Sequence, residues 1–103
     1  MIKVTVLYPN GLDVSFDMTY YCEKHIPMVS GLLGDALKGG QVDEGVSGGG
    51  EGVAAPFAAM GHLIFDTVED FQESFGPNAE QIMADLPNFT NSEPVIQISE
   101  VRM

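Results

Sequence analysis

The sequence predicts an α+β domain whose strands and helices follow the order β-α-β-β-α-β. Two kinds of periodicity support this fold class. Four short stretches carry apolar residues in alternation or in unbroken runs, which is typical of strands. Two longer stretches carry apolar residues at helical spacing. The chain has 103 residues, close to the commonest domain size, so we expect residues 1–103 to form a single domain.

The four expected strands differ in how deeply they should be buried. Residues 2–8 alternate between an apolar face and a more polar one, as a half-buried strand does. Residues 41–46 form a weaker second strand. Residues 56–65 are an almost unbroken apolar run, which favours a central position in the sheet. The last strand follows Pro94.

Each of the two expected helices has its own start signal. Asp17 is a suitable N-cap, and Phe16 before it can pack onto the first turns as a hydrophobic staple. Gly34 can close this helix in the left-handed conformation. Thr67 is a suitable cap for the second helix, which we expect to resume at residues 77–83. The whole order is the ferredoxin-like arrangement, an antiparallel sheet with both helices on one face.

The other face of such a sheet carries no helix. Strand parity places there a mixture of polar and apolar side chains, namely Lys3, Thr5, Leu7, Val95, Gln97, Ser99 and Val101. A second copy of the chain closing over this open face would bury a semi-polar surface. We therefore expect a homodimer that pairs sheet to sheet, with a monomer as the alternative.

Composition and charge exclude several classes of partner. Fifteen acidic residues face four basic ones, which gives a formal charge of -11. Such a surface repels phosphate backbones and anionic lipids, so neither nucleic acid nor membrane is an expected partner. Apolar residues make up 45% of the chain, too many for disorder and too interrupted for a membrane span. With one cysteine and no signal-peptide pattern, we expect a cytoplasmic protein.

Three features that suggest chemistry have simpler explanations. The Gly-rich residues 45–52 lack the Lys-Ser/Thr pair of a P-loop and lead into a strand, so we expect a mobile hairpin loop, with a lid as the alternative. Two histidines and one cysteine show no metal-binding spacing, so no metal is expected. Cys22 has no base on its own helix face and is expected to be an inert small hydrophobe.

The stretch from Tyr21 to Pro27 is the strongest candidate for a site. Tyr21 and His25 are four residues apart, so phenol and imidazole share one helix face. Pro27 cannot donate to the carbonyl of Glu23, and we expect it to bend the helix and open the space towards the sheet. Two interpretations stay open: a kinked core helix with a hydrogen-bonded histidine, or a cleft with an acid–base histidine and a phenol donor.

His62 lies beside Gly61 in the third strand. Parity places it opposite the face of Leu63 and Phe65, so we do not expect it to meet His25 within one protomer unless a bulge at Gly61 turns the strand. A structural role and a ligand-facing role suit it equally. The expected wall of a ligand pocket is apolar, although such residues are more often plain core: Met28, Phe71, Phe75 and Phe89.

Four segments resemble the EthD-like family of the dimeric α/β-barrel superfamily. They are FDMTYYCEKHIPMV, GHLIFDTVEDF, ADLPNFT and PVIQISEV, which occur in the family's order and cover most of the chain. The resemblance implies ferredoxin-like protomers paired sheet to sheet. It also places Tyr21 and His25 in the family's motif on the first helix, and His62 at its histidine on the third strand. Relatives in the superfamily include polyketide cyclases, cofactor-free monooxygenases and lactone isomerases.

The sequence and the resemblance together favour a small-molecule enzyme that acts on an apolar, aromatic or oxygenated metabolite by histidine-assisted acid–base chemistry. The candidate catalytic residues are His25, Tyr21 and His62. Enolisation, cyclisation or substrate-assisted oxygenation needs no cofactor, because the substrate supplies the acidic proton or the electrons, and none is expected. The activity would be oxidoreductase-, cyclase- or isomerase-like. The alternative is a non-catalytic ligand-binding accessory protein to a degradative oxygenase.

Overall fold

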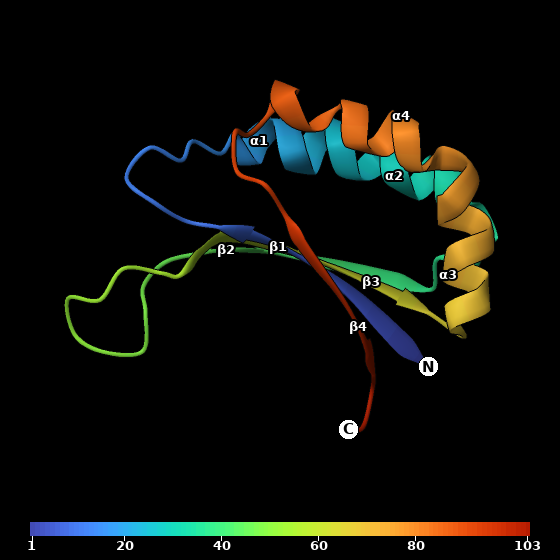
Figure 1. Cartoon of the computed structure of the whole chain (residues 1–103). Coiled ribbons are helices and arrows are strands. Elements are labelled where there is room, and N and C mark those ends of the chain that lie inside the picture. The colour runs from blue at the N-terminus through green and yellow to red at the C-terminus, as the bar shows by residue number, and fades with distance from the viewer.

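A four-stranded antiparallel sheet covered by helices on one face forms the protein (Figure 1). The computed structural model describes all residues from 1 to 103. The strands are β1 (Ile2–Pro9), β2 (Gly39–Glu44), β3 (Phe57–Phe65) and β4 (Val95–Glu100), and they lie side by side in the order β2-β3-β1-β4. This order and the single helical layer confirm the predicted ferredoxin-like α+β fold.

The strand register decides which side chains face the helices. Val4 of β1 lies between Leu63 of β3 and Ile98 of β4, so these three residues share the helical side of the sheet. Phe65 and Val29 pack on the same side, in a core that joins the sheet to both helical segments. On the other side, Thr5 lies between His62 and Gln97, as strand parity predicts.

The first helical segment begins with the expected cap. The Asp17 carboxylate accepts a hydrogen bond from the backbone N–H of Tyr20 at 3.0 Å. The rings of Phe16 and Tyr21 contact each other with centroids 5.1 Å apart, which is the predicted staple. At the other end Gly34 has a φ of 61°, but its ψ of −138° lies outside the left-handed helical region that we expected.

The sequence led us to expect one α-helix bent at Pro27, and this expectation is wrong. This segment consists of α1 (Met18–Tyr20), a π-helical turn (Tyr21–His25) and α2 (Ile26–Leu33). In the π-turn the Ile26 N–H donates to the Tyr21 carbonyl, five residues back. The irregularity therefore precedes Pro27, which lies in the first turn of α2, where its missing N–H is tolerated.

The second helical segment consists of α3 (Val68–Phe75) and α4 (Ala79–Ala84), joined by a 3-10 turn. The Thr67 hydroxyl accepts from the Asp70 N–H at 3.0 Å and so caps α3, as predicted. After α4 the chain makes another 3-10 turn, Leu86–Asn88, before it enters β4. This last turn carries the chain back over the first helical segment (Figure 1).

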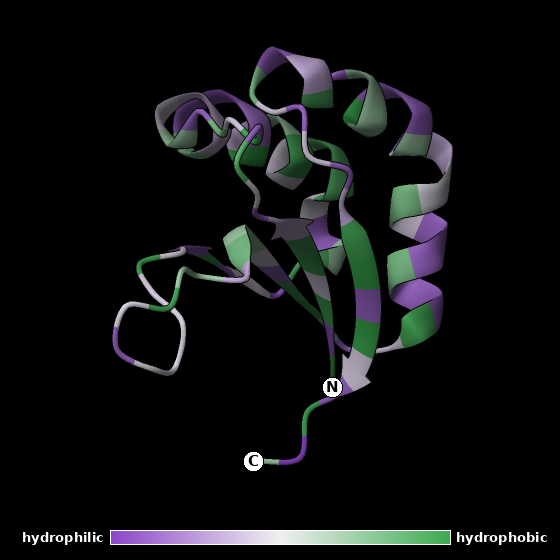
Figure 2. Ribbon diagram, turned by 60° about the vertical axis from the view of Figure 1, so that its left-hand side comes forward, coloured by the Kyte–Doolittle hydropathy of each residue, from purple (hydrophilic) through white to green (hydrophobic).

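The Gly-rich residues connect β2 to the antiparallel neighbour β3, which confirms the expected hairpin loop. The loop projects beyond the end of the sheet in both views (Figures 1 and 2). Gly52 adopts a φ of 74°, a conformation that side-chain-bearing residues rarely take. None of the helices is long and apolar enough to cross a membrane.

Candidate functional site

The imidazole of His25 lies buried between the π-turn and the end of α4. It is only 3% exposed, and its Nδ1 lies 2.9 Å from Oδ2 of Asp85. Asp85 directly follows the last residue of α4. The second helical segment thus supplies a carboxylate to a histidine of the first.

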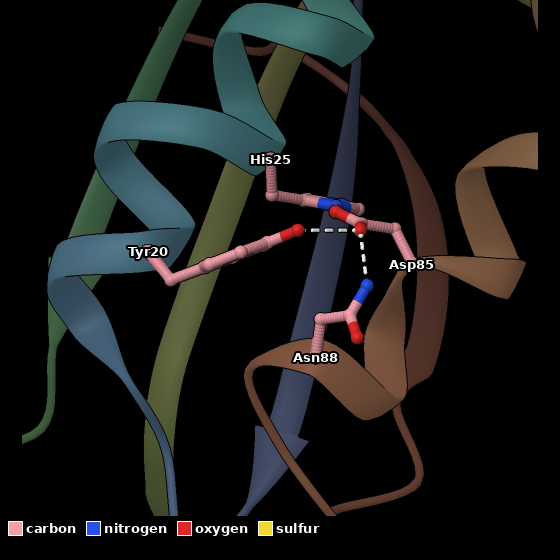
Figure 3. Close-up of polar contacts among 4 residues, drawn as sticks. All are labelled: Tyr20, His25, Asp85 and Asn88. Atoms are coloured by element: carbon pink, nitrogen blue, oxygen red, sulfur yellow. Dashed lines mark hydrogen bonds and ion pairs between the residues drawn. The ribbon is translucent and has the colours of Figure 1, made fainter.

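Three side chains converge on the Asp85 carboxylate (Figure 3). The Tyr20 hydroxyl donates to Oδ1 at 2.7 Å and the Asn88 amide donates to the same oxygen at 2.9 Å, while His25 contacts Oδ2. Desolvation acts to raise the pKa of Asp85, but hydrogen bonds from Asn88, His25 and Tyr20 outweigh it and hold the pKa below its ordinary value. Asp85 is therefore a charged acceptor at neutral pH.

This carboxylate fixes the tautomer of the neutral histidine. Since ionised Asp85 can only accept, Nδ1 of His25 must carry a proton. The other ring nitrogen, Nε2, then has a free lone pair, and it makes no hydrogen bond to another residue of the chain. His25 is thus oriented at one nitrogen and available at the other.

A cavity of about 40 Å³ adjoins the His25 ring. Its walls are mostly apolar and come from the sheet and from α2 and α4, with Val6, Leu63 and Ile96 on one side and Ile26, Val29 and Ile82 on the other. Besides His25, the side chains that bring polar atoms to it are Tyr8 and Tyr21, and no charged side chain lines it. One water molecule needs roughly 10–15 Å³ on this scale, so the space suits a few waters or a small apolar molecule.

Tyr21 is the phenol closest to His25 in this site. The two rings stack with centroids 5.4 Å apart and planes at 15°. The Tyr21 hydroxyl lies over Gly61 of β3, so close that a methyl group at position 61 would collide with it. Burial raises the pKa of Tyr21 to about 12, so the hydroxyl remains a hydrogen-bond donor at neutral pH. Burial also raises the pKa of Tyr8, whose ring meets Tyr21 edge-on.

The four expected wall residues separate into different environments. Phe75 lines the cavity. Phe89 does not line it, but its ring contacts His25, with the two centroids 4.6 Å apart. Met28 and Phe71 do not line the cavity; both pack into the core formed with Val29 and Phe65. Their helical spacing gave the same signal as a pocket wall, because core and pocket residues are equally apolar.

His62 lies on the open face of the sheet, as strand parity predicts. Its Nδ1 is 3.2 Å from the Thr5 hydroxyl and its Nε2 is 2.8 Å from Oδ2 of Asp43. The pairing of β1 with β3 runs through Gly61 without a bulge, so the two histidines remain on opposite faces within one chain. Cys22 is exposed and its thiol contacts the Met18 sulfur. No three His, Cys, Asp or Glu side chains gather in a metal-binding arrangement.

Sequence reasoning did not identify Asp85, Tyr20 or Asn88 as site residues. Asp85 is 60 positions from His25, and no local periodicity connects them. The available signal was the segment ADLPNFT, which holds Asp85 and Asn88 and which we used only as a mark of resemblance. A polar pair just after a helix, in a family motif, is a reasonable place to look for a partner of a buried histidine.

The fold and this geometry define an α+β protein with an oriented histidine beside an apolar cavity. The EthD domain family matches residues 9–93, and the chain belongs to that family. An EthD-like protein from Ralstonia eutropha JMP134 is 39% identical, with a TM-score of 0.95 over 99% of this chain and 92% of that one.

Two further solved structures share the fold at lower identity. An ethyl tert-butyl ether degradation (EthD) family protein from Bacillus halodurans C-125 is 17% identical, with a TM-score of 0.68 over 99% of both chains. A protein from Arabidopsis thaliana is 13% identical, with a TM-score of 0.72 over 100% of this chain and 97% of that one. No curated protein matches the chain.

Proposed function

We propose that this EthD-family protein is an enzyme that uses His25 as an acid–base on a small apolar or aromatic, oxygenated molecule bound in the cavity. One observation carries the proposal: the Nδ1 of a buried histidine is held by an ionised carboxylate, while its ring lines an apolar cavity. In this proposal the residue that assists His25 is Asp85 and not His62.

The roles of the residues follow from their contacts. Asp85 holds the Nδ1–H tautomer, so Nε2 is the atom that accepts a proton from the ligand. The imidazolium formed in that step is stabilised by the same carboxylate, as in the Asp–His pairs of hydrolases. Tyr21, stacked on the imidazole, donates a hydrogen bond to a ligand oxygen on which negative charge develops.

A purely structural role for His25 explains less of this arrangement. A core histidine is normally hydrogen-bonded at both nitrogens, because a buried polar atom without a partner costs about 1–3 kcal/mol. Here Nδ1 has Asp85, and Nε2 has no partner in the chain. Since no fully buried side-chain nitrogen or oxygen lacks a partner, Nε2 is not sealed in the core but stays accessible. The ring borders a cavity instead of being enclosed by packed side chains, so a ligand can reach it.

The second candidate function is a ligand-binding accessory protein without catalysis. The cavity walls favour it as much as they favour an enzyme, because an apolar pocket with few polar groups is what small-ligand sites share. The two functions differ only in whether the bound molecule is changed.

The test combines ligand-observed NMR with product analysis. Small oxygenated compounds are screened for binding to the wild type and to His25→Gln, and each compound that binds is then incubated with both proteins. A compound converted by the wild type alone supports the enzyme. Binding without conversion supports the accessory protein. Binding that is equal in the two proteins for every compound would rule out a site at His25.

We also propose that two copies pair through their open sheet faces. The side chains there are neither fully polar nor fully apolar, and nothing in the chain covers them (Figure 1). Val95 is 54% exposed and Val101 is 39% exposed on this face. A second copy would cover both, and would also bury the hydrogen-bonded group of Thr5, His62 and Asp43.

A further inference from the structure

We infer that the cavity takes an uncharged carbonyl compound, whose oxygen accepts a hydrogen bond from Tyr21 and whose neighbouring carbon gives a proton to Nε2 of His25. This inference rests on the proposed function and narrows its substrate class. Three independent features support it: the charges around the cavity, the kinds of polar group that reach it, and the positions of those groups.

The charges around the cavity disfavour an anionic ligand. No lysine or arginine lines it, so the counter-cation for a bound carboxylate or phosphate would have to be a protonated His25, whose charge Asp85 already balances. The ionised Asp85 carboxylate lies directly behind the His25 ring and would repel an anion as well. The chain as a whole carries a formal charge of -11.

The polar groups of the cavity suit a ligand that has an acceptor oxygen and, at a different atom, an acidic proton. Burial keeps the Tyr21 and Tyr8 phenols protonated, and a protonated phenol is a hydrogen-bond donor. The Tyr8 hydroxyl is paired with that of Tyr21, so Tyr21 is the donor that remains for a ligand. A ligand oxygen with two lone pairs and no hydrogen of its own suits this donor. Nε2 of His25 is the opposite kind of group, because it has a lone pair to accept a proton.

The donor and the base occupy different positions in the site. The Tyr21 hydroxyl lies against the sheet, over Gly61, whereas His25 is held towards α4 by Asp85. In an alcohol the acceptor and the acidic hydrogen are on the same oxygen. In a carbonyl compound the acidic hydrogen is on the adjacent carbon, so one ligand can reach both groups at once.

The reaction step is an enolisation that needs no co-reactant. The α C–H bond breaks and its proton moves to Nε2, while its electron pair forms a carbon–carbon double bond and moves the carbonyl electrons onto oxygen. The Tyr21 hydroxyl stabilises the resulting enolate by hydrogen bonding. Returning the proton from His25 restores the carbonyl compound, and no oxidation or reduction occurs.

The experiment uses three probes of similar size: butanone, propanoate and 2-butanol. All three are small, as a cavity of about 40 Å³ requires. Propanoate keeps the shape of butanone but is an anion, and 2-butanol keeps the oxygen but lacks the carbonyl. Binding is followed through the ring signals of His25, and α-proton exchange of butanone in D₂O is followed by NMR, with free imidazole at the same concentration as reference.

We expect butanone to shift the His25 signals more than propanoate or 2-butanol, and its α-protons to exchange faster with the wild type than with imidazole. His25→Gln should abolish the excess rate, and Tyr21→Phe should lower it by about 10²-fold, the loss typical of one oxyanion donor. Glu23→Gln is the control. Glu23 lies at an exposed position in the π-turn, and its substitution should leave the excess exchange rate unchanged.

Two results would overturn the inference. The first contradicts only the carbonyl assignment, and the second also contradicts the proposed acid–base function. If propanoate or 2-butanol shifts the His25 signals more than butanone does, the carbonyl assignment is wrong but a ligand site at His25 remains. If none of the three probes shifts the His25 signals and butanone exchanges no faster than with imidazole, both the substrate class and the proposed acid–base function fail.

Discussion

Asp85 accepts hydrogen bonds from residues of both helical segments, Tyr20 and His25 from the first and Asn88 from the turn after α4. Asp85→Asn keeps the shape but removes the charge, and an amide can present its NH₂ group to His25 instead of an oxygen. We expect the Nε2–H tautomer to become populated and the exchange rate of butanone to fall at least about tenfold. ¹⁵N NMR of the histidine ring measures the tautomer. An unchanged Nδ1–H tautomer in the variant would contradict the positioning role.

The lowered pKa of Asp85 predicts a specific loss of stability in acid. A carboxyl whose folded pKa lies below its unfolded value stabilises the protein fully above the unfolded value, 3.8. That contribution is lost as the pH falls from 3.8 through the lower folded pKa. We therefore expect the free energy of unfolding of the wild type to fall more steeply below pH 4 than that of Asp85→Asn. Urea unfolding between pH 2.5 and pH 7 measures both slopes, and parallel curves would show that Asp85 is not responsible.

At the level of elements, the π-turn places both Tyr21 and His25, and Pro27 follows it in the first turn of α2. Pro27→Ala restores a backbone donor in α2, which allows residues 21–25 to return to α-helical bonding. We expect the melting temperature to hold or rise, while the ring signals of Tyr21 and His25 shift and butanone binding weakens. Ser30→Ala in α2 is the control, and should leave ring signals and binding unchanged. A large drop in melting temperature for Pro27→Ala would mean that core packing requires the π-turn.

Two glycines offer a matched pair of substitutions. A methyl at position 61 would collide with the Tyr21 hydroxyl, so Gly61→Ala should cost about 1–3 kcal/mol of stability and displace Tyr21. A methyl at position 31, in α2, meets nothing within 4 Å, so Gly31→Ala should stabilise the protein by about 0.5–1 kcal/mol. Urea unfolding measures both changes. Equal effects would show that the Tyr21 hydroxyl does not approach the strand so closely.

The elements could be predicted because their signals are local. The alternation in β1, the apolar run of β3 and the caps Asp17 and Thr67 each lie within a few residues of the structure they specify. The π-turn could not, because it spans only five residues, too few for a change of helical period to be read from the apolar pattern. Pro27 marked an irregularity but not its kind. His25 was found from its i,i+4 partner Tyr21, whereas Asp85 reaches it only through the tertiary packing of α4 on the first helical segment.

For the whole molecule, the open sheet face is the surface through which we expect two copies to pair. An antiparallel sheet can leave one face in water, so the fold alone permits a monomer. Here that face carries Leu7, Met60 and Ile64 beside polar neighbours, and no helix covers it. Apolar side chains gathered on an uncovered face are typical of a contact with another protein.

We expect light scattering at micromolar concentration to give about twice the chain mass of 11.1 kDa. Leu7→Glu puts a charge in the middle of the open face and should shift the mass to that of a monomer, because an unpaired charge is costly in an interface. Leu12→Glu is the control, since Leu12 is fully exposed in the loop after β1. A monomeric wild type would contradict sheet-to-sheet pairing directly. A dimer that survives Leu7→Glu would place the interface on another surface, such as the exposed Ile96 and Ile98 on the helical side of β4.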